Sequence, residues 1–272
     1  MPTILKARLL GDFALSYDHE PIQGTFTERS QALLTYLLLN RHMPQPRQRL
    51  AFHLWSNSAD TQARTNLRKE LSYLRRVLPN ADQILQVDAK TMQWQPSLSF
   101  TLDVAQFEEA VKAAVKEAPA LSKKYLEQAL ELYRGNLLPD CDDEWILPER
   151  ERLQQMYIGA LEQLIKLLKE QQDYRLALNY AQQLLRVDTL NESNYCTLMR
   201  LYSLMGDRAN ALQVYHRCMM TLREELGINP SPTTRKLYEQ LLQEDELLED
   251  ATSPQVTPRF HASIPSRPIL YL

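Results

Sequence analysis

The sequence predicts an α+β domain over residues 1–97, followed by an all-α domain over residues 98–247. In the first part, short runs with strand-like composition flank three stretches with helical spacing of apolar residues. In the second part, helical spacing continues almost throughout, and part of the pattern repeats. Residues 248–272 contain several prolines and are expected to form a flexible tail or linker.

The N-terminal domain is expected to open with two strands and two helices. The strand-like runs are residues 4–10 and 13–17, and the turn signal Gly11-Asp12 separates them. Leucines at helical spacing then predict helices over residues 27–40 and 47–55. These two helices precede the segment that carries most of the functional information.

A third helix is predicted over residues 60–78, with Asp60 as its N-cap. One side of this helix is an apolar stripe, which we expect to dock on the core. Its members are Ala63, Leu67, Leu71, Leu74 and Leu78. The opposite face is basic and rich in hydrogen-bonding groups. Its members are Thr65, Arg68, Lys69, Ser72, Tyr73 and Arg76. This combination is typical of a helix that reads DNA, and an ordinary solvated helix is the alternative.

A β-hairpin is predicted directly after the third helix, between residues 84 and 94. Apolar and polar residues alternate in this run, and a turn falls at residues 88–90. Strands, three helices and a hairpin in this order make a winged helix-turn-helix. The tip of the wing carries Lys90 and Thr91, which we expect to reach backbone phosphates beside the groove that the third helix occupies.

The residue types on the predicted DNA surface suggest a division of roles. On the face of the third helix that would enter DNA first, short hydroxyl, amide and ammonium groups suit the base edges of the major groove. The candidates for base contacts are Thr65, Asn66, Lys69 and Ser72. Other groups on the helix, on the wing and at the start of the second helix suit phosphates. The candidates for phosphate contacts are Arg47, Arg49, Arg68, Tyr73, Arg76, Lys90 and Thr91.

Charge supports a nucleic-acid partner locally, although the whole chain has a net charge of −3. Residues 1–96 hold twelve Lys or Arg against eight Asp or Glu, whereas the remainder holds nineteen against twenty-six. Between Arg41 and Arg76 the count is eight basic residues against two acidic ones. Neutralising the phosphates of a duplex requires such a concentration of positive charge.

The all-α segment contains a repeat with an offset of 34 residues. The matched pairs are Asp173 with Asp207, Ala177 with Ala211, Leu178 with Leu212, Leu164 with Leu198, and Leu167 with Leu201. This period is that of tetratricopeptide helix pairs, so a tetratricopeptide-like helical repeat domain is expected. Residues 121–133 are an earlier helix candidate, and residues 232–242, capped by Ser231, are a closing one. A plain helical bundle is the alternative.

Other classes of function find little support in the residues. Six glycines stand singly, and none forms a phosphate-binding loop, so a nucleotide hydrolase is not expected. The separation of Cys141, Cys196 and Cys218 favours buried free thiols in a reducing cytoplasm over a metal or thiol site. The acidic cluster at residues 142–144 and the charged run at residues 149–152 are expected to be solvated charges rather than an acid–base pair. We therefore expect no enzyme, no cofactor, no metal and no membrane span.

In their order, the motifs of the chain resemble bacterial regulators of the antibiotic-regulatory-protein (SARP) type. The resemblance covers roughly residues 3–245. Its markers in the first domain are residues 9–13 (LLGDF), 54–55 (LW), 63–67 (ARTNL) and 74–76 (LRR). In the second domain they are residues 103–108 (DVAQFE), 132–139 (LYRGNLLP), Trp145, 149–153 (ERERL) and 224–232 (EELGINPSP). The chain departs from the pattern at Gln172, where the repeat usually has glycine.

The resemblance implies a winged helix-turn-helix joined to a bacterial transcriptional activation domain. Such a protein is a sequence-specific DNA-binding transcriptional regulator, usually an activator that recruits RNA polymerase at promoters with direct repeats. The expected partners are therefore double-stranded DNA, RNA polymerase and a second copy of the chain on the DNA. The competing hypothesis is a scaffold whose helical repeats bind a protein partner without specific DNA binding.

Overall fold

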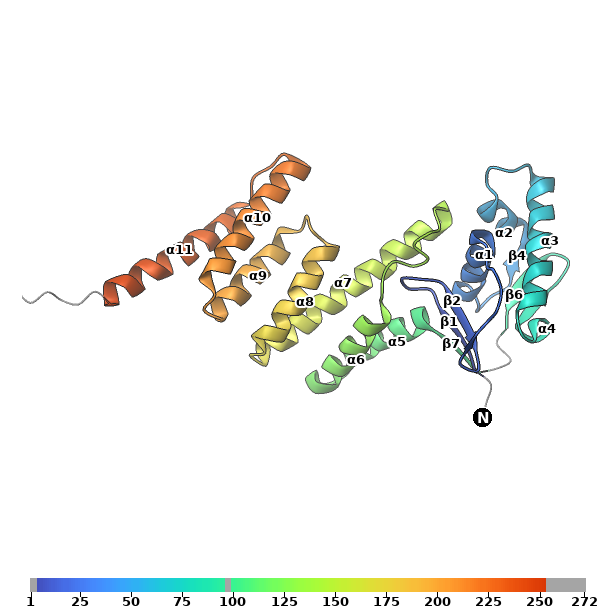
Figure 1. Ribbon diagram of the computed structural model, residues 1–272, viewed down its shortest axis with the longest axis horizontal. Helices are drawn as coiled ribbons and strands as arrows, with labels where there is room; N and C mark the ends of the chain where they lie inside the picture. Colours follow the sequence, from blue (N-terminus) through green and yellow to red (C-terminus); the bar gives the residue numbers. More distant parts are fainter. Residues whose placement is uncertain (1–3, 96–98, 253–272) are drawn as a thin grey trace, which may run out of the picture. The chain divides into compact units, whose positions relative to one another are not determined.

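The computed structural model describes residues 4–95 and 99–252 of the 272-residue chain (Figure 1). The chain divides into two compact units between Asn194 and Tyr195. Residues 96–98, which contain the predicted domain boundary at residue 97, lie outside the described residues, as do residues 253–272 of the predicted tail. No helix in the two described ranges has the length and apolar character that crossing a membrane requires.

A four-stranded sheet in the order β3-β2-β1-β7 opens the first unit. Its strands are β1 (Ile4–Arg8), β2 (Ala14–Tyr17), β3 (Glu20–Pro21) and β7 (Ser99–Leu102). The two predicted strands and the turn between them are confirmed. Strand β1 pairs antiparallel with β2, and Gly11 between them has a φ of +91°. Strand β1 also pairs in parallel with β7. The sheet is therefore completed by residues that follow the predicted hairpin at residues 84–94.

Three helices, a fourth short helix and a hairpin lie between β3 and β7 (Figure 1). The helices are α1 (Glu28–Leu39), α2 (Arg47–Leu54) and α3 (Asp60–Val77), followed by the short α4 (Ala81–Ile84). The predicted hairpin is confirmed: β5 (Leu85–Val87) pairs antiparallel with β6 (Thr91–Trp94). We call β5, β6 and the turn between them the wing. Strand β4 (Gln45–Pro46) pairs with β6, and this attaches the wing to the segment before α2.

Helix α3 packs its apolar stripe into the core, as predicted. The stripe residues Ala63, Leu67, Leu71, Leu74 and Leu78 are all at most 5% exposed. The prediction of Asp60 as N-cap is wrong, because Asp60 is the first helical residue and Ala59 occupies the cap position without a side-chain hydrogen bond. From its helical position Asp60 instead forms an ion pair with Arg64, one turn further along.

The first unit continues with four α-helices and a short 3₁₀ helix. They are α5 (Asp103–Lys116), α6 (Pro119–Leu132), η1 (Glu144–Ile146), α7 (Leu147–Glu170) and α8 (Tyr174–Val187). Neighbours in the chain pack together, α5 on α6, α6 on α7 and α7 on α8. The stacking of Tyr133 on Tyr157, with ring centroids 4.2 Å apart, joins the end of α6 to α7.

The aspartates of the sequence repeat occupy equivalent positions in the structure, at the starts of two helices. Asp173 caps α8 by accepting from the Leu176 N–H, and Asp207 caps α10 by accepting from the Asn210 N–H, at 3.2 Å in both cases. The residue before each cap is left-handed, with φ of +61° at Gln172 and +75° at Gly206. Gln172 thus keeps the left-handed turn of the repeat, in a conformation that glycine adopts without strain and that costs free energy for glutamine.

The remaining helices are α9 (Glu192–Leu204), α10 (Arg208–Leu226) and α11 (Pro232–Thr252). A core of Met199, Ala211, Tyr215 and Leu241 holds the second unit together. The predicted cap at Ser231 is confirmed, because its hydroxyl accepts from the Thr234 N–H. Helix α11 continues past residue 242, so the predicted tail begins inside this helix.

Candidate nucleic-acid interface

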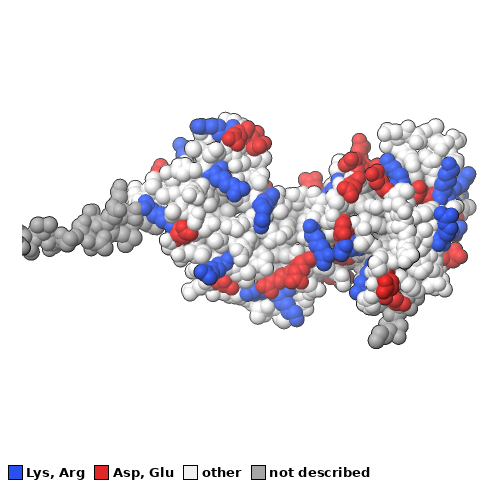
Figure 2. Space-filling model, in the orientation of Figure 1, with Lys and Arg blue, Asp and Glu red and all other residues white. Residues whose placement is uncertain are grey.

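The outward face of α3 forms a shallow groove with a volume of about 390 Å³. We call this groove the α3 surface. Its lining residues are Thr65, Arg68, Lys69, Ser72, Tyr73 and Arg76. These are the six residues that helical spacing places opposite the apolar stripe, so the predicted composition of this face is confirmed. Figure 2 shows Lys and Arg side chains along the edge where Figure 1 draws α3.

Two hydroxyls of the α3 surface are bonded to their own helix. Thr65 Oγ1 donates to the Thr61 carbonyl at 2.9 Å, and Ser72 Oγ donates to the Arg68 carbonyl at 3.0 Å. Each hydroxyl proton is therefore used, while the oxygen lone pairs remain available as acceptors. In a major groove such acceptors suit the amino groups of adenine or cytosine.

The positive charge of the α3 surface is not neutralised by neighbouring carboxylates. Within residues 4–95 and 99–252, no ion pair involves Arg68, Lys69 or Arg76. By contrast, Arg64 is paired with Asp60, and Arg75 lies 3.7 Å from Asp82. The unpaired cations of α3 thus all lie on its outward face.

Tyr73 connects the α3 surface to the N-terminal segment. Its hydroxyl donates to the Thr25 carbonyl at 2.8 Å, and its ring meets the Phe26 ring edge-on. The Arg76 guanidinium lies over the Tyr73 ring, 5.5 Å from its centroid, which holds this cation in place. The predicted phosphate contact of Tyr73 stays a prediction, and its hydroxyl proton is already used inside the domain.

The start of α2 is bonded to the wing. The Arg47 guanidinium donates to the Asp88 carbonyl at 3.1 Å, and its backbone N–H donates to the Lys90 carbonyl at 2.9 Å. Thr91 Oγ1 donates to the Asp88 carboxylate at 3.3 Å. The structure therefore brings Arg47, Lys90 and Thr91 together, and Lys90 is exposed at the tip. Their contact with phosphate stays a prediction.

Arg49 lies apart from the other predicted phosphate contacts. It borders a separate hollow of about 780 Å³, next to the exposed Phe52 and the half-buried His53. Burial and, secondarily, the Arg49 guanidinium lower the pKa of His53. The structure thus places Arg49 on the outer side of α2, and its contact with phosphate stays a prediction.

Asp103 ties the N-terminal sheet to the first helix of the helical segment. Its Oδ2 accepts from the N–H groups of Leu9 and Leu10, and its Oδ1 accepts from the N–H of Val104, each at 2.8 Å. Burial raises the pKa of Asp103, and the three backbone bonds partly oppose this shift. From the sequence Asp103 stood out only as part of a motif, because its partners Leu9 and Leu10 lie more than ninety residues away.

A second connection involves Arg29 on α1. Its guanidinium donates to both carboxylate oxygens of Asp143 at 2.7 Å. The Trp145 indole N–H donates to the same carboxylate at 3.2 Å, and its ring packs edge-on against Tyr36 of α1. Trp145 thus anchors this segment to α1 by packing. The expectation that residues 142–144 are all solvated is wrong for Asp143, because Arg29 and Trp145 engage its carboxylate.

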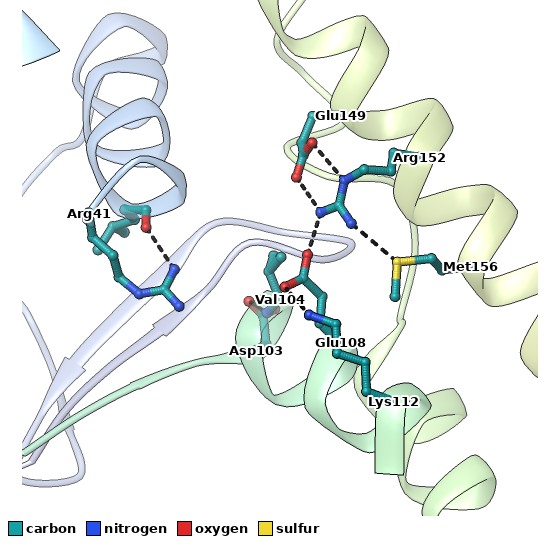
Figure 3. Close-up of polar contacts among 9 residues, drawn as sticks. Arg41, Asp103, Val104, Glu108, Lys112, Glu149, Arg152 and Met156 are labelled. Atoms are coloured by element: carbon teal, nitrogen blue, oxygen red, sulfur yellow. Dashed lines mark hydrogen bonds and ion pairs between the residues drawn. The ribbon is translucent and has the colours of Figure 1, made fainter. Parts of the chain in front are cut away.

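At the start of α7, Glu151 is exposed as predicted, whereas Glu149 differs from the prediction. Figure 3 shows Arg152 held between Glu149 of α7 and Glu108 of α5, with the Met156 sulfur on its other side. The Glu149 hydrogen bonds, followed by those of Glu108, raise the pKa of Arg152. Glu149 is thus half-buried and ion-paired rather than freely solvated, because Arg152 draws it onto α5.

Comparison with known proteins gives matches over most of the chain. Residues 102–242 match the family model of the bacterial transcriptional activator domain. The chain is 27% identical over 253 residues to the transcriptional regulatory protein MoaR1 of Mycobacterium tuberculosis, covering 85% of this chain and 78% of MoaR1. It is 26% identical over 254 residues to the transcriptional regulatory protein EmbR of the same species, covering 88% of this chain and 63% of EmbR.

Two further matches extend the comparison. The regulatory protein AfsR of Streptomyces coelicolor is 26% identical over 253 residues, which cover 92% of this chain and 25% of AfsR. The solved structure of M. tuberculosis EmbR in complex with a low affinity phosphopeptide matches with a TM-score of 0.71 and 25% identity. That match covers 89% of this chain and 66% of the EmbR chain.

Proposed function

This chain belongs to the bacterial transcriptional activator domain family as a SARP-type regulator, and from that premise we propose that it binds a specific DNA sequence through the α3 surface. The observation that carries the proposal is the unneutralised charge of Arg68, Lys69 and Arg76 above an apolar stripe docked in the core. A helix in this state presents its polar face to a groove without exposing apolar surface.

The proposed contacts fall into two sets. Thr65, Asn66, Lys69 and Ser72 read base edges, because their short polar groups lie on the part of α3 that enters the major groove. Phosphates are contacted by Arg47, Arg49, Arg68, Tyr73, Arg76, Lys90 and Thr91. Arg47 supports the wing in this arrangement, since its two bonds fix the turn that carries Lys90.

We further propose that the DNA site contains direct repeats, that two copies bind side by side, and that the complex recruits RNA polymerase in the bacterial cytoplasm. The helical segments offer the surfaces for protein partners, because stacked helix pairs present extended faces. The domain limits that we propose are residues 1–97 and 98–247. A scaffold without DNA binding is not favoured, because the relatives are transcriptional regulatory proteins.

Two single substitutions separate base contacts from phosphate contacts. We expect Lys69→Ala to relax the preferred sequence at one or two positions by about tenfold. We expect Arg76→Ala to weaken binding to all duplexes alike and to reduce the slope of log affinity against log salt by about 1. The measurement is a titration of the full chain at several salt concentrations, with duplexes it selects from a random pool.

The matched control is Lys166→Ala, an exposed lysine on α7. It should change neither the sequence preference nor the salt dependence. Indistinguishable effects of Lys69→Ala and Arg76→Ala would contradict the proposed division of roles. A wild-type chain that selects no sequence from the pool would contradict specific binding itself.

A further inference from the structure

Two amide side chains near the start of α3, those of Gln62 and Asn66, are bonded to each other. Gln62 Nε2 donates to Asn66 Oδ1 at 2.9 Å. Gln62 is exposed and Asn66 is half-buried, and both lie in the first two turns of α3, beside the α3 surface. Asn66 is a predicted base contact, whereas Gln62 has no assigned role.

The bond fixes what each amide can offer to a ligand. The oxygen of Asn66 is occupied by Gln62, so its amide presents N–H donors outward. Gln62 has used one of its two N–H groups, and it keeps the second N–H together with its Oε1 acceptor. Within the described ranges, neither amide has another hydrogen-bond partner in the protein. Gln62 therefore carries an adjacent donor and acceptor on a side chain that Asn66 holds in place.

We propose that Gln62 reads an adenine in the major groove and that Asn66 positions its amide for this contact, a proposal that rests on DNA binding by the α3 surface. Adenine presents the N7 acceptor beside the N6 amino donor. Oε1 of Gln62 accepts from the N6 amino group while its free N–H donates to N7. The amide thus makes two bonds to one base, and its bond to Asn66 is kept.

The other bases fit this arrangement less well. Guanine presents two acceptors, N7 and O6, so one of them would face the Gln62 oxygen. Cytosine offers an amino donor, and thymine offers an acceptor beside a methyl group, so each can satisfy one half of the amide. Adenine is the base whose pattern matches both groups of Gln62.

Asn66 has a positioning role toward Gln62 in addition to its proposed base contact. A free glutamine side chain loses considerable rotamer entropy when it is fixed against a base. The bond from Gln62 to Asn66 fixes part of this freedom before DNA arrives. Asn66→Ala should therefore weaken the adenine preference that Gln62 provides, even though the Gln62 amide is unchanged.

The test uses the full chain and a pool of random duplexes. The wild type should enrich sites with a defined adenine, and Gln62→Ala should lower the preference for that base by about tenfold at that position alone. Replacing this adenine by 7-deazaadenine, which lacks the N7 acceptor, should weaken the wild type severalfold and leave Gln62→Ala unaffected. Asn66→Ala should reduce sensitivity to 7-deazaadenine to an intermediate level.

The controls separate this inference from the proposed function. Gln155→Ala, an exposed glutamine on α7, should change no position of the site. A purely structural role of Gln62 would alter the melting temperature and leave the base preference as it was, and this result would overturn the inference. The inference would also be overturned if the wild type enriched a defined site in which Gln62→Ala changed the preference for no adenine. DNA binding by the α3 surface would then stand. A wild type that enriches nothing would overturn the proposed function.

Discussion

Reversing two charges on the α3 surface, Arg68→Glu with Arg76→Glu, is expected to lower the affinity of the full chain for its selected duplex roughly a thousandfold near 0.1 M salt. Each arginine that neutralises a phosphate releases a counterion, and its loss costs close to tenfold at this salt concentration. The repulsion that the two glutamates add together accounts for roughly another tenfold. Neither arginine forms an ion pair in the described ranges, so the fold should be retained.

The matched control is Lys166→Glu with Arg175→Glu, which changes the net charge equally on α7 and α8. Both control residues are exposed. If the control weakened binding as much as the α3 variant, the effect would reflect net charge rather than contact by the α3 surface. Electrophoretic mobility shifts of both variants, with circular dichroism to verify folding, make the comparison.

Asp103→Ala should produce a large loss of stability in the first unit. The substitution leaves the N–H groups of Leu9, Leu10 and Val104 without their acceptor. Asp103 is 7% exposed, so water replaces these bonds poorly. We expect the free energy of unfolding to fall by about 4 kcal/mol, since each buried unsatisfied donor costs roughly 1–3 kcal/mol before any relaxation.

Urea denaturation of the full chain, followed by circular dichroism, measures this loss. Asp82→Ala is the control, because the Asp82 side chain is 91% exposed and lies 3.7 Å from Arg75. A surface pair of this kind contributes at most about 1 kcal/mol. Equal midpoints for Asp103→Ala and the wild type would mean that Asp103 does not hold the sheet to α5.

Helix α3 could be predicted from the sequence because both of its faces follow the helical period. Leu67 and Leu71 had to be buried together, and this alone placed Arg68 and Lys69 outward. The wing was predictable for a similar reason, since alternation along a strand and a local turn are both short-range signals. The start of α3 was less predictable, because Asp60 suits both the cap and the first turn.

Contacts between distant segments could not be predicted in this way. Asp143 is 114 residues from Arg29, and in the sequence both look like ordinary surface charges. The parallel pairing of β7 with β1 likewise depends on where the chain returns after the wing. Such pairings carry no local period, so the structure was needed to find them.

The central claim is that the outward face of α3 lies against DNA bases when the regulator is bound. Site-specific photocrosslinking tests this claim directly: a photoreactive amino acid replaces Thr65 in one variant and Glu162, an exposed residue on α7, in another. Each full-length variant is irradiated on the duplex that the wild type selects. We expect crosslinks to bases within the selected site from position 65 and none from position 162. Crosslinks from position 162 alone, or no crosslink from position 65 while the duplex is bound, would contradict the account.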